Sequence, residues 1–118
     1  PYTTLFRSRG IEIGVALNPE TPLSSIDSYV DLLDVVQFMT VHPGRQGAPF
    51  VPEVRKKIQT FAARPHRPKI SVDGGINPDT IHEVASWGVE ICNVGSFFSK
   101  AASISQALTE LRLVLSES

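Results

Sequence analysis

The sequence predicts an α/β fold in which parallel β-strands alternate with α-helices. Short apolar runs recur along the chain, stretches with helical periodicity separate them, and the turns between them are rich in glycine and proline. Strands that are joined by helical crossovers run parallel, and their continuous apolar sequences predict that both faces of the sheet are buried. The predicted order of elements is β-α-β-α-β-α-β-α.

The composition is that of a globular protein with no nucleic-acid or membrane partner. Its 118 residues include 11 Lys and Arg, 12 Asp and Glu, and one cysteine, for a net charge of −1. A nucleic-acid binder normally carries a basic excess, and a membrane span needs about 20 consecutive apolar residues, which the sequence lacks. One cysteine excludes an internal disulfide, so we expect a cytoplasmic protein.

The first two strands and the first helix are predicted between residues 11 and 41. Residues 11–17 form a short apolar strand that ends in a turn rich in helix-breaking residues. A helix is expected from Thr21 to about Leu33, because Pro22 suits the first helical position and apolar residues then recur at helical spacing. Residues 34–41 are apolar and β-branched enough for a buried second strand.

The remaining elements alternate in the same way. Helices are predicted at residues 50–63, 77–87 and 103–115, and strands at residues 69–72 and 89–94. The basic run Arg55 to Lys57 is expected to be a solvated helix face. The last helix is predicted to bury the apolar face formed by Ile104, Leu108, Leu111 and Leu115.

Two architectures fit this order, namely a closed (β/α) barrel and an open doubly wound sheet. In both, the reactive groups gather at the carboxyl ends of the strands. A barrel needs eight β/α units and at least about 200 residues, whereas this chain supplies four units. The nucleotide-binding form of the open sheet is disfavoured, because no G-x-G-x-x-G motif follows a strand.

Glycine-rich turns follow three of the predicted strands. Gly74 and Gly75 follow one strand, Gly95 and Ser96 follow the next, and a third loop carries Gly44 and Gly47. Glycine lets backbone N–H groups approach an anion closely, and a following helix adds partial positive charge. One such turn alone is explained by tight backbone geometry, but the three together predict a phosphate-binding site.

Asp73 and Met39 are the further candidates for chemistry at the strand ends. Asp73 precedes the Gly74 turn, so its carboxylate either exchanges a proton with a carbon acid, assisted by a divalent metal, or caps the turn that follows. Met39 lies late in an apolar strand, where it belongs either to the core or to the floor of a site. The residues alone leave these alternatives open.

Together, the strand-end motifs resemble the C-terminal half of the ribulose-phosphate 3-epimerase family, whose members are TIM (β/α)8 barrels. The matching stretches are GVALNPETP, DVVQFMTVHPG, KISVDGGIN and VGS, in the order of the family. The resemblance implies that residues 9–118 are about four C-terminal β/α units, a half barrel. Residues 1–8 (PYTTLFRS) instead resemble translated sequencing-adaptor read-through, so we predict that they are not native.

The resemblance also implies a reaction, the interconversion of D-ribulose 5-phosphate and D-xylulose 5-phosphate through an enediolate. Asp73 matches an aspartate that is both an acid–base group and a metal ligand, and the divalent cation would be Zn, Fe, Mn or Co. Met39 matches a methionine near the enediolate. The matching phosphate and substrate contacts are Gly74, Gly75, Gly95 and Ser96.

The chain departs from the family pattern in the loop that follows the second predicted strand. The family reads PGFGGQ, whereas Pro43 to Ala48 reads PGRQGA, with Arg45 and Gln46 in place of an aromatic residue and a glycine. Two alternatives follow, namely a non-catalytic phosphate-binding barrel and an epimerase for another ketose phosphate. Because the other metal ligands belong to strands outside this chain, we expect no activity from these residues alone. The open strand edges predict a homo-oligomer.

Overall fold

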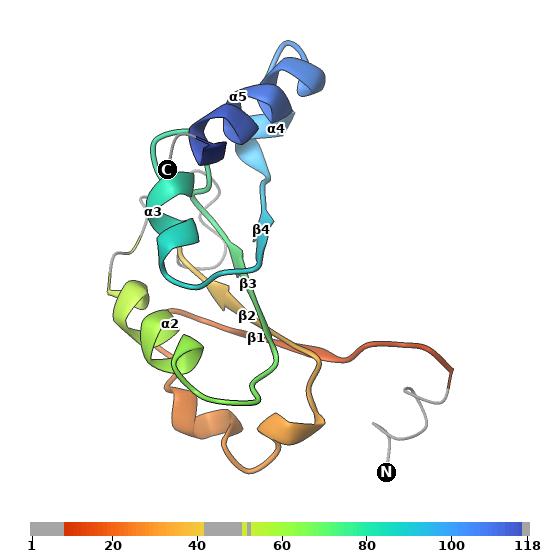
Figure 1. Cartoon of the computed structure of the whole chain (residues 1–118), viewed down its shortest axis with the longest axis vertical. Helices are drawn as coiled ribbons and strands as arrows, with labels where there is room; N and C mark the ends of the chain where they lie inside the picture. Colours follow the sequence, from red (N-terminus) through yellow and green to blue (C-terminus); the bar gives the residue numbers. More distant parts are fainter. Residues whose placement is uncertain (1–8, 42–50, 52, 117–118) are drawn as a thin grey trace.

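The computed structural model of the chain describes residues 9–41, 51 and 53–116. Its centre is a parallel sheet of four strands in the order β1-β2-β3-β4 (Figure 1). The strands are β1 (Gly14–Leu17), β2 (Val35–Met39), β3 (Lys69–Asp73) and β4 (Ile91–Asn93).

Helical segments follow each of the strands. They are η1 (Leu23–Ile26), η2 (Val30–Leu32), α2 (Val54–Ala62), α3 (Ile81–Ser86), α4 (Ser96–Ser99) and α5 (Ile104–Ser116). This order confirms the predicted alternation of strands with helical segments. Within the described part of the chain, no helix is long and apolar enough to cross a membrane.

The strand order distinguishes between the two predicted architectures. A doubly wound sheet reverses its strand order part-way and carries helices on both faces. Here the order follows the sequence without reversal, and α2 and α3 lie on the same side of the strands (Figure 1). This arrangement is that of consecutive units of a (β/α) barrel.

The two faces of the sheet differ sharply. The outer face, which the helices cover, carries Val36, Phe38, Ile70 and Val72, and each of these side chains is at most 1% exposed. Phe38 packs edge-on against Phe61 of α2, with ring centroids 5.7 Å apart. The inner face carries a set of mostly polar side chains: Gln37, Met39, Ser71, Asp73 and Asn93.

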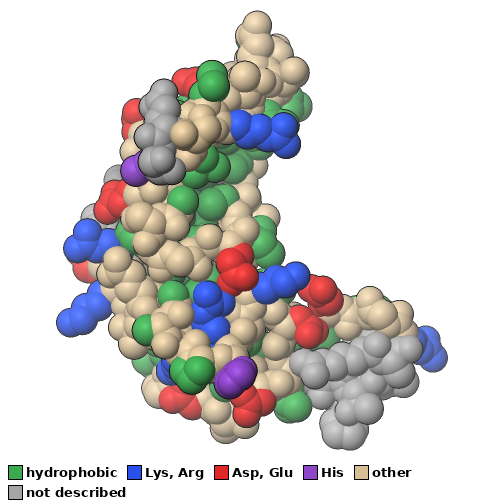
Figure 2. Space-filling view, in the orientation of Figure 1, with side chains coloured by type: hydrophobic (Ala, Val, Ile, Leu, Met, Phe, Trp, Pro, Cys, Tyr) green, Lys and Arg blue, Asp and Glu red, His purple; other side chains and the backbone are tan. Residues whose placement is uncertain are grey.

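The prediction that both sheet faces are buried is wrong for the described residues. On the inner face, Ser71 is buried, Met39 and Asp73 are half-buried, and Asn93 is exposed. The space-filling view shows the molecule hollowed on one side (Figure 2). Along the strands, apolar residues that face the helices therefore alternate with residues of the mostly polar inner face.

The predicted helix between Thr21 and Leu33 is instead two short 3₁₀ segments, η1 and η2. Pro22 precedes η1 without any side-chain cap, and the Ser25 hydroxyl donates to the Pro22 carbonyl. Serine that bonds to nearby backbone in this way competes with regular helix formation. Tyr29 then leaves helical geometry at φ −135° and ψ 13°, which separates the two segments.

The last helix is where predicted, but its predicted apolar face is mostly exposed. Leu111 is buried, whereas Ile104, Leu108 and Leu115 are 64%, 38% and 37% exposed. Among the described residues, α3 and α4 pack against α5, and Leu111 and Ala107 are buried there. Helix α4 was not predicted, because four residues are too few to show a helical period.

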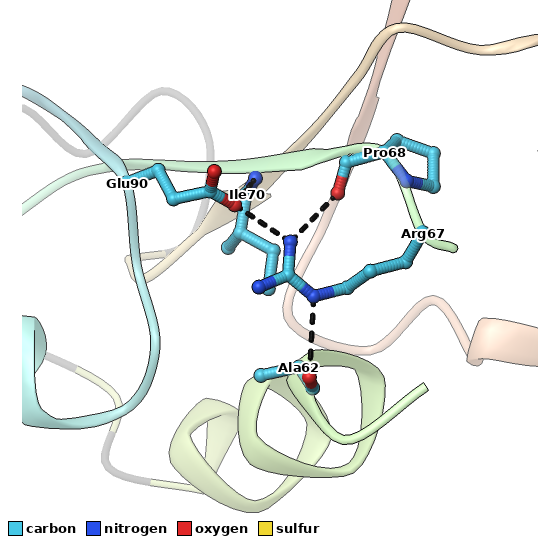
Figure 3. Close-up of polar contacts among 5 residues, drawn as sticks. All are labelled: Ala62, Arg67, Pro68, Ile70 and Glu90. Carbon is cyan, nitrogen blue, oxygen red and sulfur yellow. Dashed lines mark hydrogen bonds and ion pairs between the residues drawn. The ribbon is translucent and has the colours of Figure 1, made fainter. Parts of the chain in front are cut away.

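An ion pair ties the elements together at the amino ends of the strands (Figure 3). Arg67 donates to Glu90 over 2.6 Å, and also to the backbone carbonyls of Ala62 and Pro68. The same Glu90 oxygen accepts the Ile70 amide over 3.1 Å. The hydrogen bond from Arg67, opposed by partial desolvation, lowers the pKa of Glu90 below its ordinary value.

Candidate functional site

Asp73 is the last residue of β3, and its side chain belongs to the inner face. In the sheet register it pairs with Met39 of β2 on one side and with Asn93 of β4 on the other. Side chains of register partners point to the same face of a sheet. The structure therefore brings Met39 and Asp73, both predicted site residues, into one row at the carboxyl end.

Thr40 fixes the backbone on which Asp73 sits. Its amide and its hydroxyl both donate to the Asp73 carbonyl, over 2.9 Å and 3.1 Å, and the hydroxyl also contacts the Gly74 carbonyl. Thr40 is fully buried. Thr40 was not predicted from the sequence, because the carbonyls that it contacts lie 33 and 34 positions later in the chain.

The turn after Asp73 requires a glycine at its first position. Gly74 has a φ of +116°, and a Cβ atom there would lie 2.8 Å from the Val41 side chain. Gly95, in the turn after β4, differs, because a Cβ there would meet open space among the described residues. Packing thus explains Gly74, whereas no described neighbour crowds the backbone of Gly95.

The two predicted phosphate turns open into the same cleft. Gly75 and Ser96 both line a cavity of about 480 Å³ between the β3–α3 turn and helices α4 and α5. Lys100 and Glu110 also line this cavity, and Lys100 brings positive charge to it. Lys100 was not predicted from the sequence, because its position depends on the short helix α4 that it terminates.

The third glycine loop, with Gly44 and Gly47, lies outside the described residues, as do Arg45 and Gln46. Their roles stay predictions. Among the residues that are described, no group of three or more His, Cys, Asp or Glu side chains could hold a metal ion. Asp73 by itself does not make a metal centre, so the described residues do not complete the predicted one.

Lys57 corrects the prediction of a fully solvated basic face on α2. Its ammonium group donates to the backbone carbonyls of Pro19 and Thr21, over 2.6 Å and 2.7 Å, and to that of Asn18 over 3.3 Å. Desolvation lowers the pKa of Lys57, and the charge of Glu20 opposes this shift. Lys57 therefore holds the turn that follows β1, which is part of the GVALNPETP motif.

A polar network on the inner face also went unpredicted. The Asn93 amide nitrogen donates to Gln37 Oε1 over 2.7 Å and to Ser71 Oγ over 2.9 Å, and Ser71 donates to Gln37 Oε1 over 3.3 Å. Gln37 Nε2 lies 3.7 Å from the sulfur of Met39. The sequence does contain one signal for this network. Gln37 precedes Met39, and Ser71 precedes Asp73, by two positions, and residues two apart in a strand lie on the same face.

Comparison with known proteins agrees with the strand-end motifs. The profile of the ribulose-phosphate 3 epimerase family matches residues 2–99. The chain belongs to the ribulose-phosphate 3-epimerase family. This membership confirms the resemblance seen in the sequence and agrees with the predicted TIM-barrel class.

Several members of this epimerase family align with most of the chain. Ribulose-phosphate 3-epimerase of Buchnera aphidicola subsp. Baizongia pistaciae is 35% identical over an alignment 115 residues long, and the alignment covers 94% of this chain and 50% of that protein. The protein of the same name from Escherichia coli K12 is 31% identical, over 96% of this chain and 52% of its own length. The chain thus spans about half the length of these curated relatives.

The crystal structure of 3-hexulose-6-phosphate synthase aligns with a TM-score of 0.46 and 18% identity, over 97% of this epimerase-family chain and 67% of that protein.

Proposed function

We propose that the full-length protein interconverts D-ribulose 5-phosphate and D-xylulose 5-phosphate by moving a proton at the third carbon. The observation that carries this proposal is the position of Asp73. It ends a parallel strand beside Met39, and the turn that follows it opens into the cleft shared with Ser96. An acid–base group next to a phosphate-binding turn suits a small sugar phosphate. Curated relatives with the name ribulose-phosphate 3-epimerase support the substrate class.

The role of Asp73 follows from the chemistry of a carbon acid. Its carboxylate accepts the proton from the third carbon, and the C–H electron pair moves toward the neighbouring carbonyl to give an enediolate. A proton delivered to the opposite face of the enediolate then inverts the configuration. This second proton requires an acid from outside the described residues.

The phosphate group is assigned to the glycine turns. Gly75 and Ser96 line the cleft, and Gly74 and Gly95 are their neighbours in the two turns. Backbone N–H groups at such turns hold an anion without using side-chain charge. We assign Gly44 and Gly47 of the third loop to the same ligand.

Metal dependence is part of the proposal. A divalent cation (Zn, Fe, Mn or Co) would stabilise the negative charge of the enediolate, and Asp73 would be one of its ligands. The remaining ligands would come from residues outside the described ones, in keeping with the proposal that residues 9–118 are half of a longer barrel. We further propose a cytoplasmic, homo-oligomeric enzyme, and light scattering tests the oligomeric state.

The test follows the reaction in deuterated water. The full-length gene product is incubated with D-ribulose 5-phosphate, and NMR records deuterium at the third carbon together with the appearance of D-xylulose 5-phosphate. Both signals are expected. Calorimetric binding of the sugar phosphate without any deuterium exchange would instead favour a non-catalytic phosphate-binding barrel. Exchange only with a different ketose phosphate would change the assigned substrate.

A further inference from the structure

Asn93 lies beside two groups that the proposed function assigns to the substrate. It is the register partner of Asp73 on the inner face, and it precedes Gly95 by two residues on the same strand end. Its side chain is exposed among the described residues. The position therefore adjoins both the proposed acid–base group and one of the proposed phosphate turns.

The hydrogen bonds of Asn93 leave one kind of polar group available. Its amide nitrogen uses both hydrogens, one on Gln37 Oε1 at 2.7 Å and one on Ser71 Oγ at 2.9 Å. No hydrogen bond to Asn93 Oδ1 is present within the described part of the chain. What remains is a carbonyl oxygen, which accepts hydrogen bonds and does not donate them.

We infer that Asn93 is a further substrate-contacting residue, whose Oδ1 accepts a hydrogen bond from a hydroxyl group of the ketose phosphate. This inference rests on the proposed function. A phosphate ester offers acceptor oxygens at neutral pH, so an acceptor oxygen does not bind it, whereas a sugar hydroxyl donates readily. Asn93 therefore contacts a hydroxyl group on the carbon chain of the substrate, and the glycine turns bind its phosphate.

Gln37 and Ser71 act as positioning residues for this contact. Gln37 Oε1 accepts from both Ser71 and Asn93, so it fixes which end of the Asn93 amide faces its neighbours. Ser71 is buried, which limits its freedom to rearrange. Because the Asn93 amide is oriented before the substrate binds, binding does not have to order it, and this favours affinity.

Calorimetry on Asn93→Leu tests the inference. The variant is made in an Asp73→Asn background of the full-length gene product, which prevents turnover, and is titrated with D-ribulose 5-phosphate and with inorganic phosphate. Loss of a neutral hydrogen bond predicts about two- to tenfold weaker binding of the sugar phosphate. Binding of inorganic phosphate should not change. Gln59→Leu is the matched control, because it removes an exposed amide on α2, away from the inner face.

Asn93→Leu is compatible with the fold, because Ser71 still donates to Gln37 after the substitution. Asn93→Ala, which creates no larger apolar side chain, provides a second measurement of the same loss. Unchanged affinity for the sugar phosphate in both variants would overturn the inference. An equal loss for inorganic phosphate would also overturn it, because it would place Asn93 at the phosphate. If the full-length protein with both Asp73 and Asn93 intact binds neither ligand, the proposed function itself fails.

Discussion

The two ends of the sheet differ in how their charged side chains are used. At the amino end, Arg67 and Glu90 form an ion pair, and each also makes a hydrogen bond to the backbone of a neighbouring element. At the carboxyl end, Asp73 and Ser96 stand beside glycine turns and an open cleft, and the Asp73 carboxylate makes no hydrogen bond within the described residues. In β/α barrels, the carboxyl end carries the chemistry and the amino end carries stability. Substitutions at the two ends should therefore separate activity from folding.

The largest effect is expected for Asp73→Asn. The amide cannot accept the proton, so kcat for epimerisation should fall about 10²- to 10⁴-fold. The free energy of unfolding should change by no more than about 0.5 kcal/mol, because only the backbone of Asp73 contributes to the fold. A coupled enzyme assay and urea unfolding of the full-length gene product measure the two quantities. Retained turnover would show that Asp73 is not the acid–base group.

The next largest effect concerns the two glycine turns at the carboxyl end. Gly74→Ala combines a φ of +116° with a Cβ that would lie 2.8 Å from Val41, so we expect a loss of about 1–3 kcal/mol in unfolding free energy. Gly95→Ala is the matched control, because its Cβ enters open space and its φ is −106°. We expect it to cost less than about 1 kcal/mol.

Chemical denaturation of the two glycine variants, side by side, provides the measurement. Equal losses for Gly74→Ala and Gly95→Ala would contradict the packing explanation of Gly74. Weakened phosphate binding by Gly95→Ala, with stability intact, would sharpen the comparison, because it would show that one end of the sheet contains a structural glycine and a ligand-facing glycine side by side.

The sequence predicts the parts of this site that depend on local pattern. Asp73 and Met39 each end an apolar run, and parallel strands bring such ends to one edge, so their proximity follows from the order of the elements. Gly75 and Ser96 were predicted in the same way. The helix between Thr21 and Leu33 was mispredicted, because Pro22 and helical spacing did not reveal the backbone change at Tyr29.

Contacts that depend on register or on distant segments could not be predicted in this way. Gln37 and Asn93 are 56 positions apart, and they meet only because the strand register places them on the inner face. Lys57 is a similar case, since the carbonyls it holds lie 36 to 39 positions earlier in the chain. One sequence does not reveal which polar residue on a helix reaches back to a preceding turn.

At the amino end, Arg67→Met should affect stability but not activity. Arg67 makes three hydrogen bonds, one of them to the Glu90 carboxylate, but Glu90 is exposed, so we expect a loss of about 1 kcal/mol. The matched control is Arg55→Met, since Arg55 and Glu83 lie 3.7 Å apart with both side chains more than half exposed. Urea unfolding should detect a loss for Arg67→Met and almost none for Arg55→Met. A reduced kcat in Arg67→Met would break the separation between the two ends.

The smallest effect is the pH dependence that Glu90 contributes. The hydrogen bond from Arg67 lowers the pKa of Glu90 in the folded protein from its ordinary value of 4.5. A carboxyl group whose pKa is lower when folded stabilises the protein above its unfolded pKa, and this stabilisation is lost as the pH falls through the folded pKa. The stability difference between the parent and Glu90→Gln should therefore be constant near neutral pH and shrink below about pH 4.5.

We expect this difference to be less than about 1 kcal/mol at neutral pH, because solvent screens the exposed carboxylate. Urea unfolding of both proteins across the acidic range measures it. A difference that grows as the pH falls would mean that Glu90 is not stabilised by Arg67. Since Glu90 lies at the opposite end of the strands from Asp73, kcat at neutral pH should be the same in both proteins. A changed kcat would show that the charge of Glu90 affects the proposed reaction.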